Sequence, residues 1–104
     1  MVEQRMIQWT GEISDSHTGD TNWQTLINEG AGAGFAWVNA SVAGGVAAGE
    51  VRVTIDGGSA MTMTVEDNDT TCSFPIQYSS SLLVEYRVND IAKTIYIQAW
   101  WNNA

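Results

Sequence analysis

The segment Glu50-Val-Arg-Val-Thr-Ile-Asp-Gly-Gly-Ser-Ala-Met-Thr-Met-Thr-Val-Glu66 decides the fold class of this chain. Apolar and polar side chains alternate along both of its arms, as they do on strands with one buried and one exposed face. Between the arms, Asp56-Gly57 supplies the positive backbone dihedrals that a tight reversal requires. The segment therefore predicts a β-hairpin, and with it an antiparallel β protein.

Outward from this hairpin, the same alternation recurs along most of the chain. Turn-forming residues separate the alternating segments at intervals of about ten residues, and no segment has the periodicity of a convincing helix. This pattern is typical of an all-β, antiparallel β-sandwich or a small barrel. We expect a sandwich, either a jelly roll or another Greek-key arrangement, whose strand order the sequence does not reveal. About eight short strands are expected, at residues 5–13, 23–28, 35–41, 51–55, 61–66, 70–78, 82–88 and 93–101.

Size and charge exclude several classes of function. The 104 residues are expected to form a single domain, residues 1–104, with a core that needs no metal or disulfide. Twelve acidic residues against four basic ones give a net charge of −8. Phosphate contacts need clustered lysine and arginine, so neither nucleic acid nor an anionic membrane is expected as a partner. The single cysteine, Cys72, excludes an intrachain disulfide and is expected to be a buried apolar side chain.

Candidate chemical sites are weak in this sequence. His17 has Asp15, Ser16 and Asp20 nearby, but catalytic groups must meet in space on a rigid frame, so a solvated histidine in a polar loop over residues 14–22 is expected. The acidic run Glu66–Asp69 reads as a solvated loop rather than a calcium site, since its spacing does not match an EF-hand. We expect no enzyme, no catalytic residue, no cofactor and no bound metal.

The aromatic residues are the stronger candidates for binding, because five tryptophans are many for a chain of this length. Trp100 and Trp101 are adjacent, so on a strand one points inward and the other outward. The outward one shares its face with Tyr96. One hypothesis makes this stripe a subunit or partner interface, and the other makes it a platform for sugar rings. A third reading is that both faces of a central strand are simply covered. The expected interface residues are Tyr96, Trp100, Trp101 and Trp9, followed by the small-residue connection 42–49.

Three segments carry a resemblance to a known group of proteins. They are Leu26-Ile-Asn-Glu-Gly-Ala-Gly, Val51-Arg-Val-Thr-Ile-Asp-Gly-Gly and Phe74-Pro-Ile-Gln-Tyr-Ser-Ser-Ser-Leu-Leu-Val-Glu-Tyr. A glycine-punctuated strand, a strand that ends in Asp-Gly and a Phe…Ser-Ser-Leu strand make the chain similar to small β-sandwich proteins of tailed-phage virions. The similarity extends from Trp23 to Trp100, about three-quarters of the chain.

This resemblance implies a structural role and supplies no catalytic residue. It implies a decoration or cement protein on the outer surface of a phage head, with a tail or fibre component left open. The expected partner is the major capsid protein or another virion protein. The expected assembly is a homo-oligomer such as a trimer, located in the virion after synthesis in the host cytoplasm. The alternative from a different class is a lectin-like, carbohydrate-binding module that uses outward-facing Trp and Tyr side chains.

Overall fold

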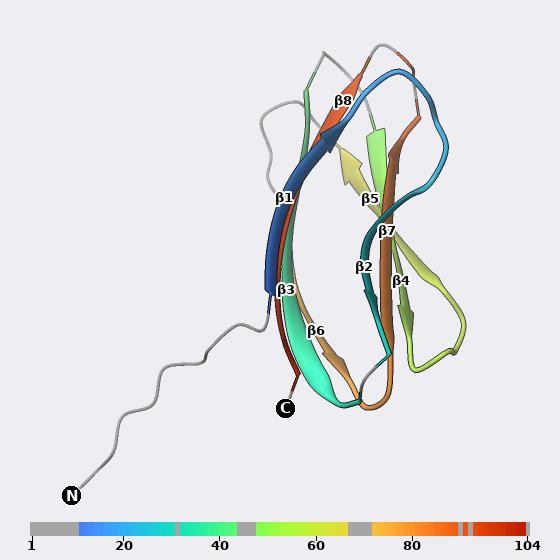
Figure 1. Ribbon diagram of the computed structural model, residues 1–104. Helices are drawn as coiled ribbons and strands as arrows, with labels where there is room; N and C mark the ends of the chain where they lie inside the picture. The colour runs from blue at the N-terminus through green and yellow to red at the C-terminus, as the bar shows by residue number, and fades with distance from the viewer. Residues whose placement is uncertain are drawn as a thin grey trace, which may run out of the picture.

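The computed structural model describes residues 11–30, 32–43, 48–66, 72–89, 91 and 93–103. In that part of the chain, eight strands form two four-stranded antiparallel sheets that pack face to face (Figure 1). This confirms the all-β sandwich that the sequence predicted. The strands are β1 (Gly11–His17), β2 (Gln24–Glu29), β3 (Gly34–Ala43), β4 (Ala48–Ile55), β5 (Met61–Glu66), β6 (Cys72–Tyr78), β7 (Leu82–Val88) and β8 (Thr94–Asn103).

The strand order is that of one long hairpin rolled into two layers. One sheet has the order β1-β8-β3-β6 and the other the order β2-β7-β4-β5. The ladders β1–β8, β2–β7, β3–β6 and β4–β5 pair the two arms of the long hairpin, whose tip joins β4 to β5. Rolling the arms adds the ladders β3–β8 and β4–β7 and divides the strands between the sheets. This is the arrangement of a jelly roll.

The hairpin tip has the backbone that Asp56-Gly57 predicted, with positive φ angles of 55° and 68° at these two residues. The N–H of Gly58 donates to the carbonyl of Ile55 at 3.0 Å. Asp56 also anchors the tip to the loop between β6 and β7, because its Oδ1 accepts the backbone N–H groups of residues 79–81 at 2.7–3.2 Å. These backbone donors, that of Ser80 above all, hold the pKa of the Asp56 carboxyl below its usual range.

The inward-facing side chains of both sheets form one apolar interior. In β7, buried and half-buried residues alternate without a break, as expected for a strand with one face on the core. The side chains of Tyr78 and Tyr86 are almost fully buried in this interior. The other members are Leu26, Ile27, Ala36, Val38, Ala40, Val42, Val51, Val53, Val65, Ile76, Leu82, Val84, Val88, Ile95, Ile97 and Ala99.

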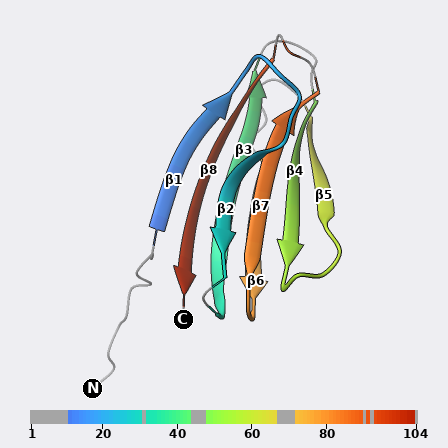
Figure 2. The same cartoon turned by 45° about the vertical axis from the view of Figure 1, so that its right-hand side comes forward.

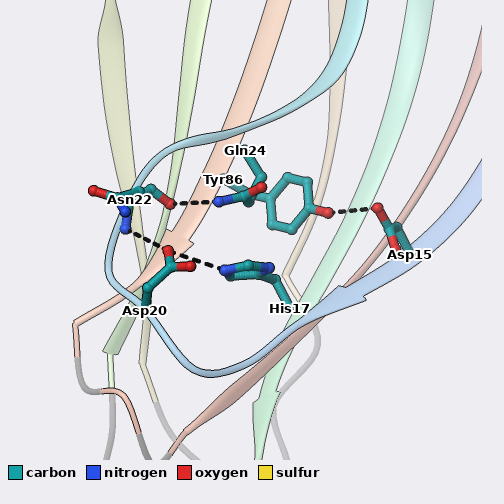
Figure 3. Close-up of polar contacts among 6 residues, drawn as sticks. All are labelled: Asp15, His17, Asp20, Asn22, Gln24 and Tyr86. Carbon is teal, nitrogen blue, oxygen red and sulfur yellow. Dashed lines mark hydrogen bonds and ion pairs between the residues drawn. The ribbon is translucent and has the colours of Figure 1, made fainter.

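The first described strand runs further than the sequence predicted. Residues 14–17, expected to be part of a polar loop, continue β1 along the edge of its sheet. An edge strand needs little apolar alternation, and here Asp15 points inward, where its Oδ2 accepts the buried Tyr86 hydroxyl at 2.7 Å (Figure 3). This bond ties β1 to β7 of the facing sheet, and it raises the pKa of Tyr86 together with burial, which is the larger cause. Residues 1–10, which include most of the predicted first strand, lie outside the described part.

Polar contacts hold the loop after β1 (Figure 3). Asp20 Oδ1 accepts the backbone N–H of Asn22 at 2.9 Å and lies 3.1 Å from Nε2 of His17, the last residue of β1. The hydrogen bond from the Asn22 N–H, and to a smaller extent the contact with His17, lower the pKa of the Asp20 carboxyl below its usual range. Half-buried His17 therefore closes a turn and is not the solvated loop histidine that was expected.

The Asp56 anchor predicts an acid-sensitive contribution to stability. Its folded-state pKa is depressed, so the carboxylate stabilises the fold above about pH 4, and this contribution is lost as the pH falls through the folded-state pKa. Asp56→Asn keeps an acceptor oxygen but removes the charge. This variant should have a lower free energy of unfolding than the wild type at pH 7, and the difference between the two proteins should be smaller at pH 3. Urea unfolding at both pH values measures this. A difference in free energy of unfolding that does not change with pH would contradict the role of the Asp56 charge. Ser59→Ala, in the turn between β4 and β5, is the control.

A side chain at position 34 is predicted to destabilise the fold. A Cβ atom at this position would overlap the carbonyl oxygen of Asn102 and the hydroxyl of Tyr78. Gly34→Ala should therefore lower the free energy of unfolding by about 1–3 kcal/mol, as overpacking of a close contact does. At Gly30, by contrast, a Cβ atom meets nothing within 4 Å, so Gly30→Ala should change stability little. Equal effects of the two substitutions in urea unfolding would contradict the close approach at Gly34.

Candidate functional site

A row of large side chains crosses the outer face of the sheet β1-β8-β3-β6. The register between β3 and β8 places Trp37 directly opposite Trp100. Glu12 of β1 continues the row beside Trp100, and Pro75 of β6 continues it beside Trp37. We call the outward side chains of these four strands the aromatic face. Its members are Glu12, Ser14, Ser16, Phe35, Trp37, Asn39, Ser41, Ser73, Pro75, Gln77, Tyr96, Gln98, Trp100 and Asn102.

Hydrogen bonds within this face satisfy the indole N–H groups. Trp37 donates from Nε1 to Asn39 Oδ1 at 3.0 Å, and Trp100 donates from Nε1 to Glu12 Oε2 at 3.2 Å. The same Asn39 oxygen accepts the Ser73 hydroxyl at 2.6 Å. Trp37 nevertheless keeps 41% of its surface exposed. What this residue offers a partner is therefore mainly an apolar ring whose one polar group is already bonded.

A row of amide and hydroxyl groups lies next to the tryptophan row. Gln98 of β8 stands between Ser14 of β1 and Asn39 of β3, and it donates from Nε2 to the Ser14 hydroxyl at 3.2 Å. Beyond this row Tyr96 is half exposed. Tyr96, Gln98, Asn39 and Ser14 contribute to the lining of a hollow of about 300 Å³. The aromatic face thus combines exposed rings with neutral hydrogen-bonding groups. Among its described members Glu12 is the only acidic side chain, and it accepts the indole N–H of Trp100.

The outer face of the other sheet has the opposite character. Arg52 of β4 forms two parallel hydrogen bonds with the Glu85 carboxylate, both of 2.9 Å, and Arg87 of β7 pairs with Glu50 at 2.8 Å. Both guanidinium groups also lie over the ring of Trp23, at 4.1 and 4.2 Å from its centroid. The bond to Glu85 raises the pKa of Arg52 above its usual value. The charges of this ionic face are therefore largely satisfied by one another.

The structure places the predicted interface residues in different environments. Tyr96 and Trp100 both project from the aromatic face, as the alternation along β8 indicated. Trp101 points the other way, is half-buried against the core and fills the space beside Gly11, so its role as an interface residue stays a prediction. Trp9 lies outside the described residues, as do residues 44–47 of the connection 42–49. Its ends, Val42–Ala43 and Ala48–Gly49, belong to β3 and β4.

Sequence reasoning missed the contribution of Trp37 to this face. The signal was present, because buried Ala36, Val38 and Ala40 alternate with outward residues along β3. That pattern assigns Trp37 to the exposed side. What the sequence did not contain is the pairing of β3 with β8, which brings Trp37 beside Trp100.

Other candidate sites find little support among the described residues. Ser16 points to the aromatic face, on the opposite side of β1 from inward-facing His17, so these neighbours do not form a nucleophile–base pair. Within the described ranges, no group of three His, Cys, Asp or Glu side chains is placed to hold a metal ion. Residues 67–69 of the acidic run lie outside them. The described part also holds no helix of the length and apolarity needed to cross a membrane.

Comparison with known proteins finds similarity of fold only. No family model and no curated sequence matches this chain. Among solved structures, it is similar to a chain in the acidic stable capsid of Helicobacter pylori bacteriophage KHP30, with 13% identity, a TM-score of 0.59 and coverage of 97% of this chain and 94% of that one. A chain of the disulfide-linked pili that form Bacillus endospore appendages gives 12% identity, a TM-score of 0.54 and coverage of 96% of each chain.

TmCBM61, solved in complex with beta-1,4-galactotriose, gives 12% identity and a TM-score of 0.50, covering 89% of this chain and 62% of that one. At such low identity these matches show a shared fold. At the level of fold, the match with a chain of a phage capsid, which extends almost end to end, bears out the resemblance noted in the sequence.

The tryptophan row predicts an energetic coupling between β3 and β8. Directly opposed side chains on one face of an antiparallel pair interact by roughly 0.2–1 kcal/mol. In a double-mutant cycle, Trp37→Ala and Trp100→Ala should therefore be non-additive by about 0.5–1 kcal/mol in urea unfolding. Trp37→Ala combined with Thr25→Ala on the other sheet is the control and should be additive. Additivity in both pairs would contradict the observed register.

Proposed function

We propose that this chain is a non-enzymatic structural protein of a virion, which binds the outer surface of a phage capsid through its aromatic face. The contrast between the two outer faces carries this proposal. On the ionic face, arginines and glutamates satisfy one another around Trp23. On the aromatic face, Trp37 and Tyr96 keep 41% and 50% of their surface exposed among uncharged amides and hydroxyls.

The composition of the aromatic face is that of a protein–protein interface. Such interfaces bury aromatic anchors at their centre and surround them with neutral hydrogen-bonding groups and a polar rim. The proposed partner is the major capsid protein or another virion protein, and the proposed location is the virion after synthesis in the host cytoplasm. The end-to-end match with a chain of a phage capsid supports a place in the virion, and a tail or fibre component stays an alternative because a pilus chain matches equally completely.

Carbohydrate binding is the second candidate, because Trp37, Trp100 and the neighbouring Gln98 offer the rings and amide groups that sugars use. The fold shared with TmCBM61 favours the same candidate. The shape of the aromatic face makes carbohydrate binding the second choice. Small-ligand sites are concave, whereas the sheet that bears the aromatic face bows outward, away from its partner sheet (Figure 1). A convex face with shallow hollows suits a broad protein surface better than an oligosaccharide.

A capsid-binding experiment tests the proposal. Capsids are prepared from the phage that encodes this chain after its gene has been deleted. The purified protein should co-sediment with these capsids. The double variant Trp37→Ala/Trp100→Ala should lose at least tenfold in affinity, as expected when central aromatic anchors are removed. Trp23→Ala, which removes a tryptophan from the ionic face, is the matched control and should still bind. Circular dichroism and urea unfolding verify that each variant is folded.

The same proteins separate the two candidate functions. Titration with galactotriose should leave the tryptophan fluorescence of the wild type unchanged. A saturable shift that disappears in Trp37→Ala/Trp100→Ala would favour the carbohydrate-binding alternative. Failure of the wild type to bind capsids would overturn the decoration role.

A further inference from the structure

Three of the four strands at the sheet edges carry a feature that discourages pairing with another chain. β1 points Asp15 and His17 inward at its edge. β2 has a bulge between Thr25 and Ile27. β6 has Pro75 in its middle, a residue that cannot donate a backbone hydrogen bond. Inward charges, bulges and proline are the devices by which proteins protect exposed strand edges.

β5 (Met61–Glu66) has none of these features within Met61–Val65. It is the terminal strand of the sheet β2-β7-β4-β5 and lies at the opposite side of the sandwich from β1 (Figure 2). It pairs with β4 in regular register over six residues, without a bulge. The segment Met-Thr-Met-Thr-Val contains neither proline nor charge. Its outer row of backbone N–H and C=O groups is thus a regular template for another strand.

The inward-facing side chains of β5 are apolar, and one of them is exposed. Met61 lies opposite Val53 on the inner side of its sheet, yet it is 52% exposed. Met63 is half-buried against the core, and Val65 is fully buried, so exposure rises along the strand toward Met61. An inward-facing methionine that remains half exposed marks a place where the described residues leave the interior open. A further strand beside β5 would cover it.

We propose that β5 pairs with β5 of a second copy of this chain, antiparallel about a two-fold axis at Met63, to form a continuous eight-stranded sheet. The strand is self-complementary, because Met-Thr-Met-Thr-Val has apolar residues at both ends and threonines on either side of Met63. In this register Thr62 meets Thr64 of the second copy, and exposed Met61 meets Val65. Such an isologous contact needs only one surface patch, and for that reason a second copy fits this edge.

This pairing is independent of the proposed capsid binding. It uses the edge of the sheet that bears the ionic face, so the aromatic face of both copies stays accessible. Each copy carries a net charge of −8, while the paired segment itself carries none. Long-range repulsion between copies is screened by salt. The association should therefore tighten as sodium chloride rises from 20 to about 300 mM, over which range the Debye length falls to less than half.

Disulfide cross-linking tests the register. In a Cys72→Ala background, which removes the native thiol, Thr62→Cys and Thr64→Cys variants are mixed and oxidised. Opposed residues in an antiparallel pair have Cα atoms 4.5–5.5 Å apart, within disulfide range, whereas diagonal neighbours lie about 7–8 Å apart. The mixture should form a covalent dimer, and each variant alone should form little. Cross-linking of either variant alone, or of no combination, overturns the proposed register.

Introducing lysines into β5 tests whether this strand pairs with a second copy. Thr62→Lys/Thr64→Lys places lysines along β5 and should weaken dimerisation at least tenfold in sedimentation velocity. Thr25→Lys/Asn28→Lys changes the net charge equally on the bulged edge of β2 and should leave dimerisation intact. A wild type that stays monomeric up to about 1 mM, or an oligomer unaffected by lysines in β5, overturns the proposal. Neither result bears on capsid binding, which is measured separately with the aromatic-face variants.

Discussion

The pairing of β3 with β8 is the contact on which the rest of the structure depends. These are the two longest strands, ten residues each, and they lie side by side in the middle of their sheet. Their inward residues, such as Val38 and Ile97, are fully buried. Because β3 belongs to one arm of the long hairpin and β8 to the other, this ladder turns an extended hairpin into a closed sandwich. β1 and β6 then add to its two sides.

The same ladder creates the aromatic face. Trp37 and Trp100 are far apart in the chain, and only the β3–β8 register places them in one row with neutral amides on either side. On the facing sheet, the β4–β7 register sets Glu50 opposite Arg87 and Arg52 opposite Glu85, so that opposite charges meet across the strands. One fold thus presents one face with its charges internally paired and another face with exposed rings. This division is compatible with the proposed capsid binding, in which the exposed rings of the aromatic face would be covered by the partner.

The hairpin tip and the two sides of the sandwich differ in the contacts that hold them. Asp56 bonds the tip to the loop before β7, so the turn that reverses the chain also fixes the neighbouring end of the sandwich. At the β1 and β2 side, the bond from Tyr86 to Asp15 joins the sheets. At the β5 side, the segment Met61–Val65 is instead a regular strand edge without a charged residue, and Met61 is exposed. In the described part of the chain, a hydrogen bond between the sheets thus lies at the β1 side, and the strand edge proposed for pairing lies at the β5 side.

The sequence by itself determined the strands and the direction in which their side chains point, because a period of two is a local property of an extended chain. Residues 51–55 and 61–66 with the turn at Asp56-Gly57 were predicted this way, and so was the outward position of Tyr96 and Trp100. The polar end of β1 was missed, since an edge strand stabilised by Asp15 and Tyr86 shows no apolar alternation. Only the tertiary structure decided the strand order, the meeting of Trp37 with Trp100 and the arginines around Trp23. These depend on pairing between distant segments, and alternation within one segment carries no information about which segment lies beside it.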